Sequence, residues 1–295
     1  MVSPTTFEVS DISGVSNLNI LVADINKLVS LPDIYYRLES AIESPSSSVD
    51  DFAKLLGSDP DLCARLLSMA NSAFYSFPAE IETIDRAIST IGLRQIRELV
   101  LATSILKMFN GVALESVDMS SFWEHSVAVG VLAKSIAQFA RLPLSDRYYI
   151  PGLLHDLGRL VLYLKLPELM QDLLTQSNIQ QQNLFLLERQ QLSYTHAEIG
   201  GRLLELWKVP QSIYEPVYYH HRPDESHEFS HTTCTIHIAD AWVNKNRLGS
   251  SGESNTPEIQ PEAMQLLGIQ ESDLDEIWSH AGEEIRDVVR QFVSH

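Results

Sequence analysis

The feature that most constrains this fold is the spacing of apolar residues, which recur at every third or fourth position along most of the chain. That period places them on one face of an α-helix, whereas a half-buried strand needs apolar residues at alternate positions. Phe122, Val129 and Ile136 form one such face, and Leu62 and Leu66 belong to another. Alternating runs are scarce. The sequence therefore predicts an all-α fold class, built from many helices.

Turn-forming residues divide these helices into blocks. Ser44-Pro45-Ser46 and Gly92 separate short helices in the first third of the chain, where Ser48 is a predicted N-cap and Pro60 suits a first helical turn. Residues 147–166 are predicted to be helical and contain a His-Asp pair. We expect an N-terminal extension (1–24), one domain (25–245) made of two helical blocks (25–110 and 120–245), a flexible loop rich in Gly and Ser (246–262), and C-terminal helices (263–295).

The charge balance argues against a nucleic-acid partner. The chain has 21 basic and 39 acidic residues, which gives a formal net charge of −18. A protein that binds nucleic acid through phosphates normally presents a basic face, and no cluster of Lys and Arg is visible. An anionic small molecule is still compatible with this charge, because bound divalent cations reverse the local sign of the potential.

Membrane insertion and secretion are not expected either. No apolar run approaches the roughly 18 residues that a membrane-spanning helix needs. The first residues have neither a basic cluster nor a following apolar run, so they do not form a secretory signal. Cys63 and Cys234 lie far apart and match no metal-binding pattern, which is typical of free thiols in a reducing compartment. We expect a cytoplasmic protein.

Several histidines and aspartates lie where the helical pattern places core residues. His125, for example, shares a helical face with Val129 and Leu132, and Asp240 shares one with Ile236. A buried imidazole or carboxylate is costly unless it is paired, hydrogen-bonded or bound to metal. Their positions on inward faces of different helices predict one shared polar centre. Its candidate members are His125, His155, Asp156, His196, His220, His221 and Asp240.

Metal binding would satisfy these side chains together. Neutral imidazoles and carboxylates suit divalent transition-metal ions such as Fe, Mn, Ni or Zn, and two such ions polarise a phosphoryl group and activate water. The alternative for any single histidine is a hydrogen-bonded core residue, which is the commoner case. The other histidines occupy polar or loop contexts and are expected to be solvated: His227, His231, His237, His280 and His295. The exception is His237, which lies one turn before Asp240 and could support the ligands from behind.

The residues also resemble a known family, the HDOD domain of bacterial signalling proteins. The resemblance extends over about residues 25–245 and implies a multi-helix HDOD fold with a helical core like that of the HD superfamily. It rests on Leu31-Pro32, Asp59-Pro60-Asp61-Leu62, Arg65-Leu66-Leu67, Ala70-Asn71-Ser72-Ala73-Phe74-Tyr75, Trp123-Glu124-His125, Gly152-Leu153-Leu154-His155-Asp156-Leu157-Gly158 and His196 with Gly200, Trp207 and Pro210.

That superfamily contains metal-dependent phosphohydrolases, and the resemblance implies a set of ligands. Four residues match its core order of His, His-Asp and Asp: His125, His155, Asp156 and Asp240. Three more match the histidines that hold a second metal in the HD-GYP branch, which includes cyclic-di-GMP phosphodiesterases: His196, His220 and His221. The resemblance therefore implies a site for two ions.

The chain departs from that branch at three places. No Gly-Tyr-Pro follows His221, Arg159 stands where those enzymes usually carry Lys, and Ser121 stands where members with three metals place Glu. These departures argue against a cyclic-di-GMP hydrolase and leave the two-ion site intact.

Three functions remain open at this point. The first is a regulatory module that passes the state of its site to a protein partner in signalling, since the first helical block supplies no evident catalytic residue. The alternative is a phosphohydrolase acting on a nucleotide or cyclic nucleotide, with His155, Asp156 and Arg159 as catalytic residues. Arg159 could equally form a salt bridge on a helix surface. The second alternative is a di-iron centre that senses oxygen or redox state.

Overall fold

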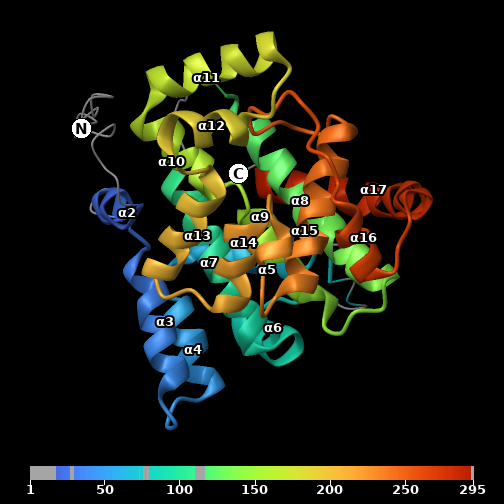
Figure 1. Cartoon of the computed structure of the whole chain (residues 1–295). Helices are drawn as coiled ribbons and strands as arrows, with labels where there is room; N and C mark the ends of the chain where they lie inside the picture. The colour runs from blue at the N-terminus through green and yellow to red at the C-terminus, as the bar shows by residue number, and fades with distance from the viewer. Residues whose placement is uncertain are drawn as a thin grey trace. The chain divides into compact units, whose positions relative to one another are not determined.

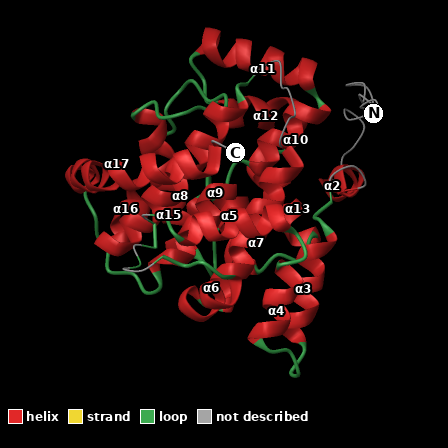
Figure 2. Ribbon diagram, turned by 180° about the vertical axis from the view of Figure 1, so that it is seen from behind, coloured by secondary structure: helices red, strands yellow, loops and turns green. Residues whose placement is uncertain are grey.

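In the computed structural model the described residues are 18–26, 30–72, 74–75, 77, 80–109 and 117–293. Every regular element among them is a helix, which confirms the all-α class (Figure 2). Most of the predicted N-terminal extension, Ala73 of the resembling segment, and His295 lie outside the described residues. The elements are α2 (Leu18–Asn26), α3 (Asp33–Glu43), α4 (Val49–Leu56), α5 (Pro60–Ala70), α6 (Ile84–Ile91), α7 (Leu93–Phe109), α8 (Met119–Phe139), η1 (Ser145–Tyr148), α9 (Tyr149–Leu154), α10 (Leu157–Lys165), α11 (Pro167–Gln180), α12 (Leu184–Leu192), α13 (His196–Leu206), α14 (Gln211–Tyr219), η2 (Pro223–Glu225), α15 (Ser230–Lys245), α16 (Pro261–Leu267) and α17 (Glu271–Val293).

The chain divides into two units. One comprises residues 29–112 and 283–295, and the other comprises residues 1–28 and 113–282. In the first unit, α7 packs against α3, α5 and α6. The predicted N-cap of α4 is confirmed, because the Ser48 hydroxyl accepts from the Asp51 backbone and the Asp51 carboxylate accepts from the Ser48 backbone. Asn71 closes the turn after α5 by bonding both backbone groups of Ile81.

The second unit contains every candidate ligand of the predicted centre. In it α13 packs against α10 and α14, while α8 packs against α9 and α15 (Figure 1). Glycines permit the closest of these approaches. A Cβ on Gly158 of α10 would overlap the carbonyl oxygen of His196 and lie 2.6 Å from the backbone nitrogen of Gly200 in α13. A Cβ on Gly152 would lie 2.8 Å from the Cα of Gly130. These contacts bring the turn between α9 and α10 against the start of α13.

The helix predicted over residues 147–166 is interrupted at the His-Asp pair. The structure has η1, α9 and α10 in its place, with a turn at His155 and Asp156. The His155 ring nitrogen Nδ1 lies 2.7 Å from the Gly152 carbonyl oxygen. In a continuous helix that carbonyl would accept the backbone N–H of Asp156. The side chain therefore competes with the helix at this point, and local periodicity alone could not show it.

A buried carboxylate, Glu215 of α14, anchors the start of α15, which carries Asp240. Its Oε2 accepts from Gln211, 2.9 Å away. Its Oε1 accepts from the Ser226 hydroxyl and from the backbone nitrogens of His227, Glu228 and Phe229, at 2.9 to 3.2 Å. Burial raises the pKa of Glu215, but these hydrogen bonds outweigh burial and lower it.

We expect Glu215→Ala to lower the free energy of unfolding by about 3 kcal/mol, because it leaves several buried donors unpaired. Since the folded-state pKa is depressed, the stabilisation is complete above the ordinary value of 4.5 and is lost as the pH falls through the lower folded-state value. Urea unfolding from pH 7 to pH 3 measures both effects. Glu215→Gln is the control, and an unchanged pH dependence in that variant would contradict the assignment.

Candidate metal centre

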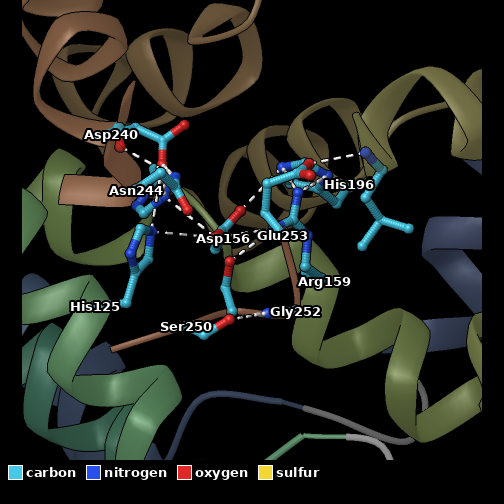
Figure 3. Close-up of polar contacts among 12 residues, drawn as sticks. His125, Asp156, Arg159, His196, Asp240, Asn244, Ser250, Gly252 and Glu253 are labelled. Carbon is cyan, nitrogen blue, oxygen red and sulfur yellow. Dashed lines mark hydrogen bonds and ion pairs between the residues drawn. The ribbon is translucent and has the colours of Figure 1, made fainter. Parts of the chain in front are cut away.

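The structure brings all seven candidate ligands together, from five places in the second unit. His125 comes from α8 and Asp240 from α15. His155 and Asp156 occupy the turn between α9 and α10, and His196 is the first residue of α13. The remaining two, His220 and His221, follow the last residue of α14. Figure 3 shows Asp156 between His125 and Asp240 on one side and His196 on the other.

One group of ligand atoms is formed by His125, His155 and Asp240, all within 4.8 Å of one another. The Oδ1 atom of Asp240 lies 3.3 Å from Nε2 of His125 and 3.5 Å from Nε2 of His155. The Oδ2 atom of Asp156 faces the same two nitrogens, at 3.8 Å and 3.2 Å. We call this set, with Oδ2 of Asp156, the first half-site.

A second group is formed by His196, His220 and His221, also within 4.8 Å. The Nε2 atoms of His196 and His221 are 3.1 Å apart, and Oδ1 of Asp156 lies 2.9 Å from Nε2 of His196. We call this set the second half-site. The two oxygens of Asp156 thus face different half-sites, which is the arrangement of a bridging carboxylate.

The ring nitrogens of this cluster fit a metal ion. Nδ1 of His155 and Nδ1 of His220 each lie 2.7 Å from the carbonyl oxygen three residues earlier, to which an N–H at that position donates. In each ring this leaves the lone pair on Nε2, and that buried atom has no hydrogen-bond partner among the described residues. The same is true of Nε2 in His125. Outer hydrogen bonds that fix the tautomer of a ligating histidine are typical of metal sites.

The electrostatics of the centre also favour a cation. Burial alone lowers the pKa of His155, but Asp156 and Asp240 outweigh burial and raise it to about 10. Burial raises the pKa of Asp156, yet Arg159, His155 and His196 hold it well below its usual range. Burial and the neighbouring imidazoles lower the pKa of His220 and of His221. Neutral imidazoles therefore stand beside ionised carboxylates.

Arg159 does not form the surface salt bridge that one interpretation of the sequence allowed. Its side chain is 2% exposed and lies inside the centre. Nη2 is 3.1 Å from Nδ1 and 3.2 Å from Nε2 of His196, and Nη1 is 3.4 Å from Asp156. Burial lowers the pKa of Arg159, but Asp156 and Glu188 outweigh burial and raise it. Arg159 is therefore a permanent cation beside the second half-site.

The loop predicted to be flexible packs against the centre instead. The Ser251 side chain is fully buried, and its hydroxyl accepts from Nη1 of Arg159 at 2.6 Å. The Ser251 carbonyl accepts from the Tyr163 hydroxyl, and Ser250 donates its backbone N–H to Ser121 in the first turn of α8. We call residues 249–255 the covering segment. Together with the helices it leaves the cluster closed to solvent: His125, His155, His196 and His220 are fully buried, and Asp156 and Asp240 are 2% and 5% exposed.

Sequence reasoning missed three polar residues that support the ligands. Glu188 is fully buried, and its Oε2 lies 2.7 Å from Nδ1 of His196. Asn244 donates to Oδ1 of Asp240 at 2.7 Å. Ser251 reaches the centre from the covering segment. The available signal for Glu188 was its position on the apolar face of α12 beside Leu184 and Leu187.

The other histidines divide as the sequence suggested. His227, His231 and His280 are exposed. His237, the expected exception, is buried: its Nδ1 lies 2.8 Å from the carbonyl oxygen of His220, and its Nε2 accepts from the backbone of Gln260. His237 thus lies behind the ligands.

Comparison with known proteins gives consistent relatives. Residues 28–223 match the HDOD domain. An uncharacterised protein of Treponema pallidum (strain Nichols) is 27% identical over 252 residues, which are 82% of this chain and 47% of that protein. The chain thus spans about half the length of the curated relative it matches.

Two solved structures have a similar fold. An HDOD domain protein of unknown function from Geobacter sulfurreducens superposes with a TM-score of 0.75 at 22% identity, covering 97% of this chain and 99% of that one. A protein of Shewanella amazonensis SB2B, provisionally named a phosphohydrolase, gives a TM-score of 0.69 at 21% identity, covering 94% of this chain and 99% of that one. Within the described residues, no helix combines the length and the apolar character needed to span a bilayer.

Proposed function

The chain belongs to the HDOD domain family, and from that premise we propose that it is a regulatory signalling protein that retains a two-ion metal centre. The single observation that carries the proposal is the convergence of five imidazoles and two carboxylates on one buried cluster, with three Nε2 atoms left without hydrogen bonds. Seven such groups would be costly to bury together without a cation.

The ligands divide between the two half-sites. His125, His155 and Asp240 would hold one ion, and His196, His220 and His221 would hold the other. Asp156 would contribute one oxygen to each. Imidazole and carboxylate ligands suit Fe, Mn, Ni or Zn. Bound ions of this kind supply a Lewis acid for phosphoryl oxygens.

The closed state of the centre favours regulation over turnover. A nucleotide is far larger than a metal ion, and it would reach these ligands only after the covering segment moved away from Arg159 and Ser121. The centre described here admits an ion without admitting a substrate. We propose that its occupancy is passed to a protein partner, as the regulatory interpretation of the sequence expects.

A phosphohydrolase acting on a nucleotide or cyclic nucleotide is the second candidate. It is favoured by the ligand order His, His-Asp and Asp, and by the two differently directed oxygens of Asp156. The similarly folded Shewanella protein carries that provisional name. In this role His155 and Asp156 would hold the ions at the reacting phosphoryl group. Arg159 would exchange the Ser251 hydroxyl for a phosphoryl oxygen and stabilise its charge.

Elemental analysis tests the metal centre directly. Protein expressed in metal-supplemented medium is expected to contain about two transition-metal ions per chain, as in other two-metal sites. Less than about half an ion per chain would reject the proposal. The loaded protein is then offered nucleotides, cyclic nucleotides and a nitrophenyl phosphodiester. We expect no turnover, and hydrolysis that disappears in His155→Ala would replace the regulatory function by the enzymatic one.

A further inference from the structure

Two acceptors compete for the protons of the His196 ring. The carboxylate of Glu188, on α12, lies 2.7 Å from Nδ1 and also accepts the backbone N–H of His196, at 2.7 Å. Asp156 Oδ1 lies 2.9 Å from Nε2. A neutral imidazole carries one ring proton and one lone pair, so only one of these two acceptors receives an N–H.

Arg159 makes this choice consequential. Its Nη2 is within 3.2 Å of both ring nitrogens of His196, and an arginine can only donate. If Nε2 carried the proton, it would donate to Asp156, and Arg159 would occupy the lone pair on Nδ1. That tautomer satisfies every partner except Glu188, and it leaves His196 with no free lone pair toward the second half-site.

We propose that Glu188 is a positioning residue that makes His196 a metal ligand, by holding the proton on Nδ1 and so directing the lone pair of Nε2 at His221 and Asp156. The inference rests on the proposed metal centre and names the residue on which its second half-site depends. Glu188 suits this role because it is fully buried and approaches His196 from a different helix. Its second oxygen, Oε1, lies 3.7 Å from Nε of Arg159 and balances that charge.

The fold prepares Glu188 for this contact. A capping box at Thr195 and Glu198 fixes the first turn of α13, where His196 is located. The backbone N–H of His196 has no partner within its own helix, because it belongs to the first turn. Glu188 takes that N–H and the ring N–H with the same oxygen, which fixes both the main chain and the ring.

The chain also provides a matched control. Glu253, in the covering segment, is a second buried carboxylate, 8% exposed. Its oxygens accept from the backbone nitrogens of Leu184 and Asn255, at 2.8 Å and 3.0 Å. Glu253→Gln therefore removes a buried charge of the same kind without removing a hydrogen bond to a ligand.

The test measures Zn²⁺ affinity by competition with a chelator and thermal unfolding by circular dichroism. Glu188→Met removes the acceptor at similar volume, and we expect it to weaken the more weakly bound ion by about 10–100-fold, the usual effect of losing an outer partner of a ligand. Glu188→Gln keeps an acceptor oxygen and should recover most of that loss. The first ion should stay within about threefold of wild type in both variants, and in Glu253→Gln both ions should.

A double-mutant cycle separates this inference from the proposed function. If Glu188 acts through His196, then Glu188→Met has no further effect on Zn²⁺ affinity in the His196→Ala background. An equal loss in that background would overturn the inference. If His196→Ala itself leaves two tightly bound ions, the second half-site fails and with it the proposed centre.

The tautomer can also be observed without metal. We expect ¹⁵N chemical shifts of the His196 ring in wild-type protein to show the proton on Nδ1. They should show it on Nε2 when Glu188 is replaced by glutamine or methionine. A proton on Nε2 alone in the wild-type protein would overturn the inference, and this measurement remains decisive even if Glu188→Met unfolds.

Discussion

Replacing Asp156 with alanine is expected to abolish tight binding at both half-sites, because each half-site uses one of its oxygens. Structural zinc sites with four ligands bind with about 10–16 kcal/mol, or about 3 kcal/mol per ligand, so one lost ligand costs about 100-fold in affinity. In Asp156→Ala each ion loses a ligand. Elemental analysis and chelator competition measure the loss, which should reduce the recovered metal to well below one ion per chain.

Asp240→Ala is the comparison that makes this result informative. Asp240 faces only His125 and His155, so its loss should remove the ion of the first half-site and leave the other. Asp156→Asn keeps the shape of the side chain and removes its charge. If Asp156→Ala retained one tightly bound ion, as Asp240→Ala is expected to do, Asp156 would not be shared between the half-sites.

The same substitution should also destabilise the chain in the absence of metal. Asp156 offsets the buried charge of Arg159, whose remaining carboxylate partner is Glu188, 3.7 Å away. Removing one partner of a buried ion pair typically costs about 3–5 kcal/mol. Thermal unfolding of the metal-free variants checks this effect separately from metal affinity.

Gly158→Ala is expected to lower the free energy of unfolding by about 3 kcal/mol or to prevent folding, the upper end of the range for an overpacked site. The added methyl group would overlap the carbonyl oxygen of His196, and backbone atoms cannot rotate aside as a side chain can. Helices α10 and α13 would therefore have to separate. Because they carry Asp156 and His196 at their first turns, this variant should also lose the second ion.

Urea unfolding and metal analysis measure both consequences for Gly158→Ala. Gly268→Ala is the control, because a Cβ there meets no atom within 4 Å, although its φ of +65° still disfavours alanine. That backbone term alone costs about 1 kcal/mol. A stability for Gly158→Ala within that margin of wild type would show that the two backbones separate easily, contrary to the packing described.

The candidate ligands could be predicted because their anomaly is local. A histidine such as His125, placed among Val129 and Leu132, violates the helical pattern in a window of a single helix. Glu188 gave a weaker signal, since Arg189, Gln190 and Gln191 follow it and the segment reads as a polar helix face. Its burial depends on where α13 begins, which no local pattern specifies.

The covering segment was beyond sequence reasoning for a different reason. Its Gly- and Ser-rich composition predicts flexibility, and its contacts are with residues far away in the chain. Ser251 meets Arg159, 92 positions earlier, and Asn255 bonds Ser177, 78 positions earlier. The burial of Arg159 follows from the same contacts, which explains why a surface salt bridge was an equally reasonable interpretation.

The backbone hydrogen bonds of His155 and His220 have a consequence for the choice of metal. Because the main chain sets the orientation of both rings, the ligands are preorganised, and replacing one ion by another should leave them in place. Such a rigid frame cannot reshape itself around a preferred ion, so intrinsic selectivity should follow the general Irving–Williams order of divalent ions. Which ion occupies the protein would then be decided by the supply in the cell.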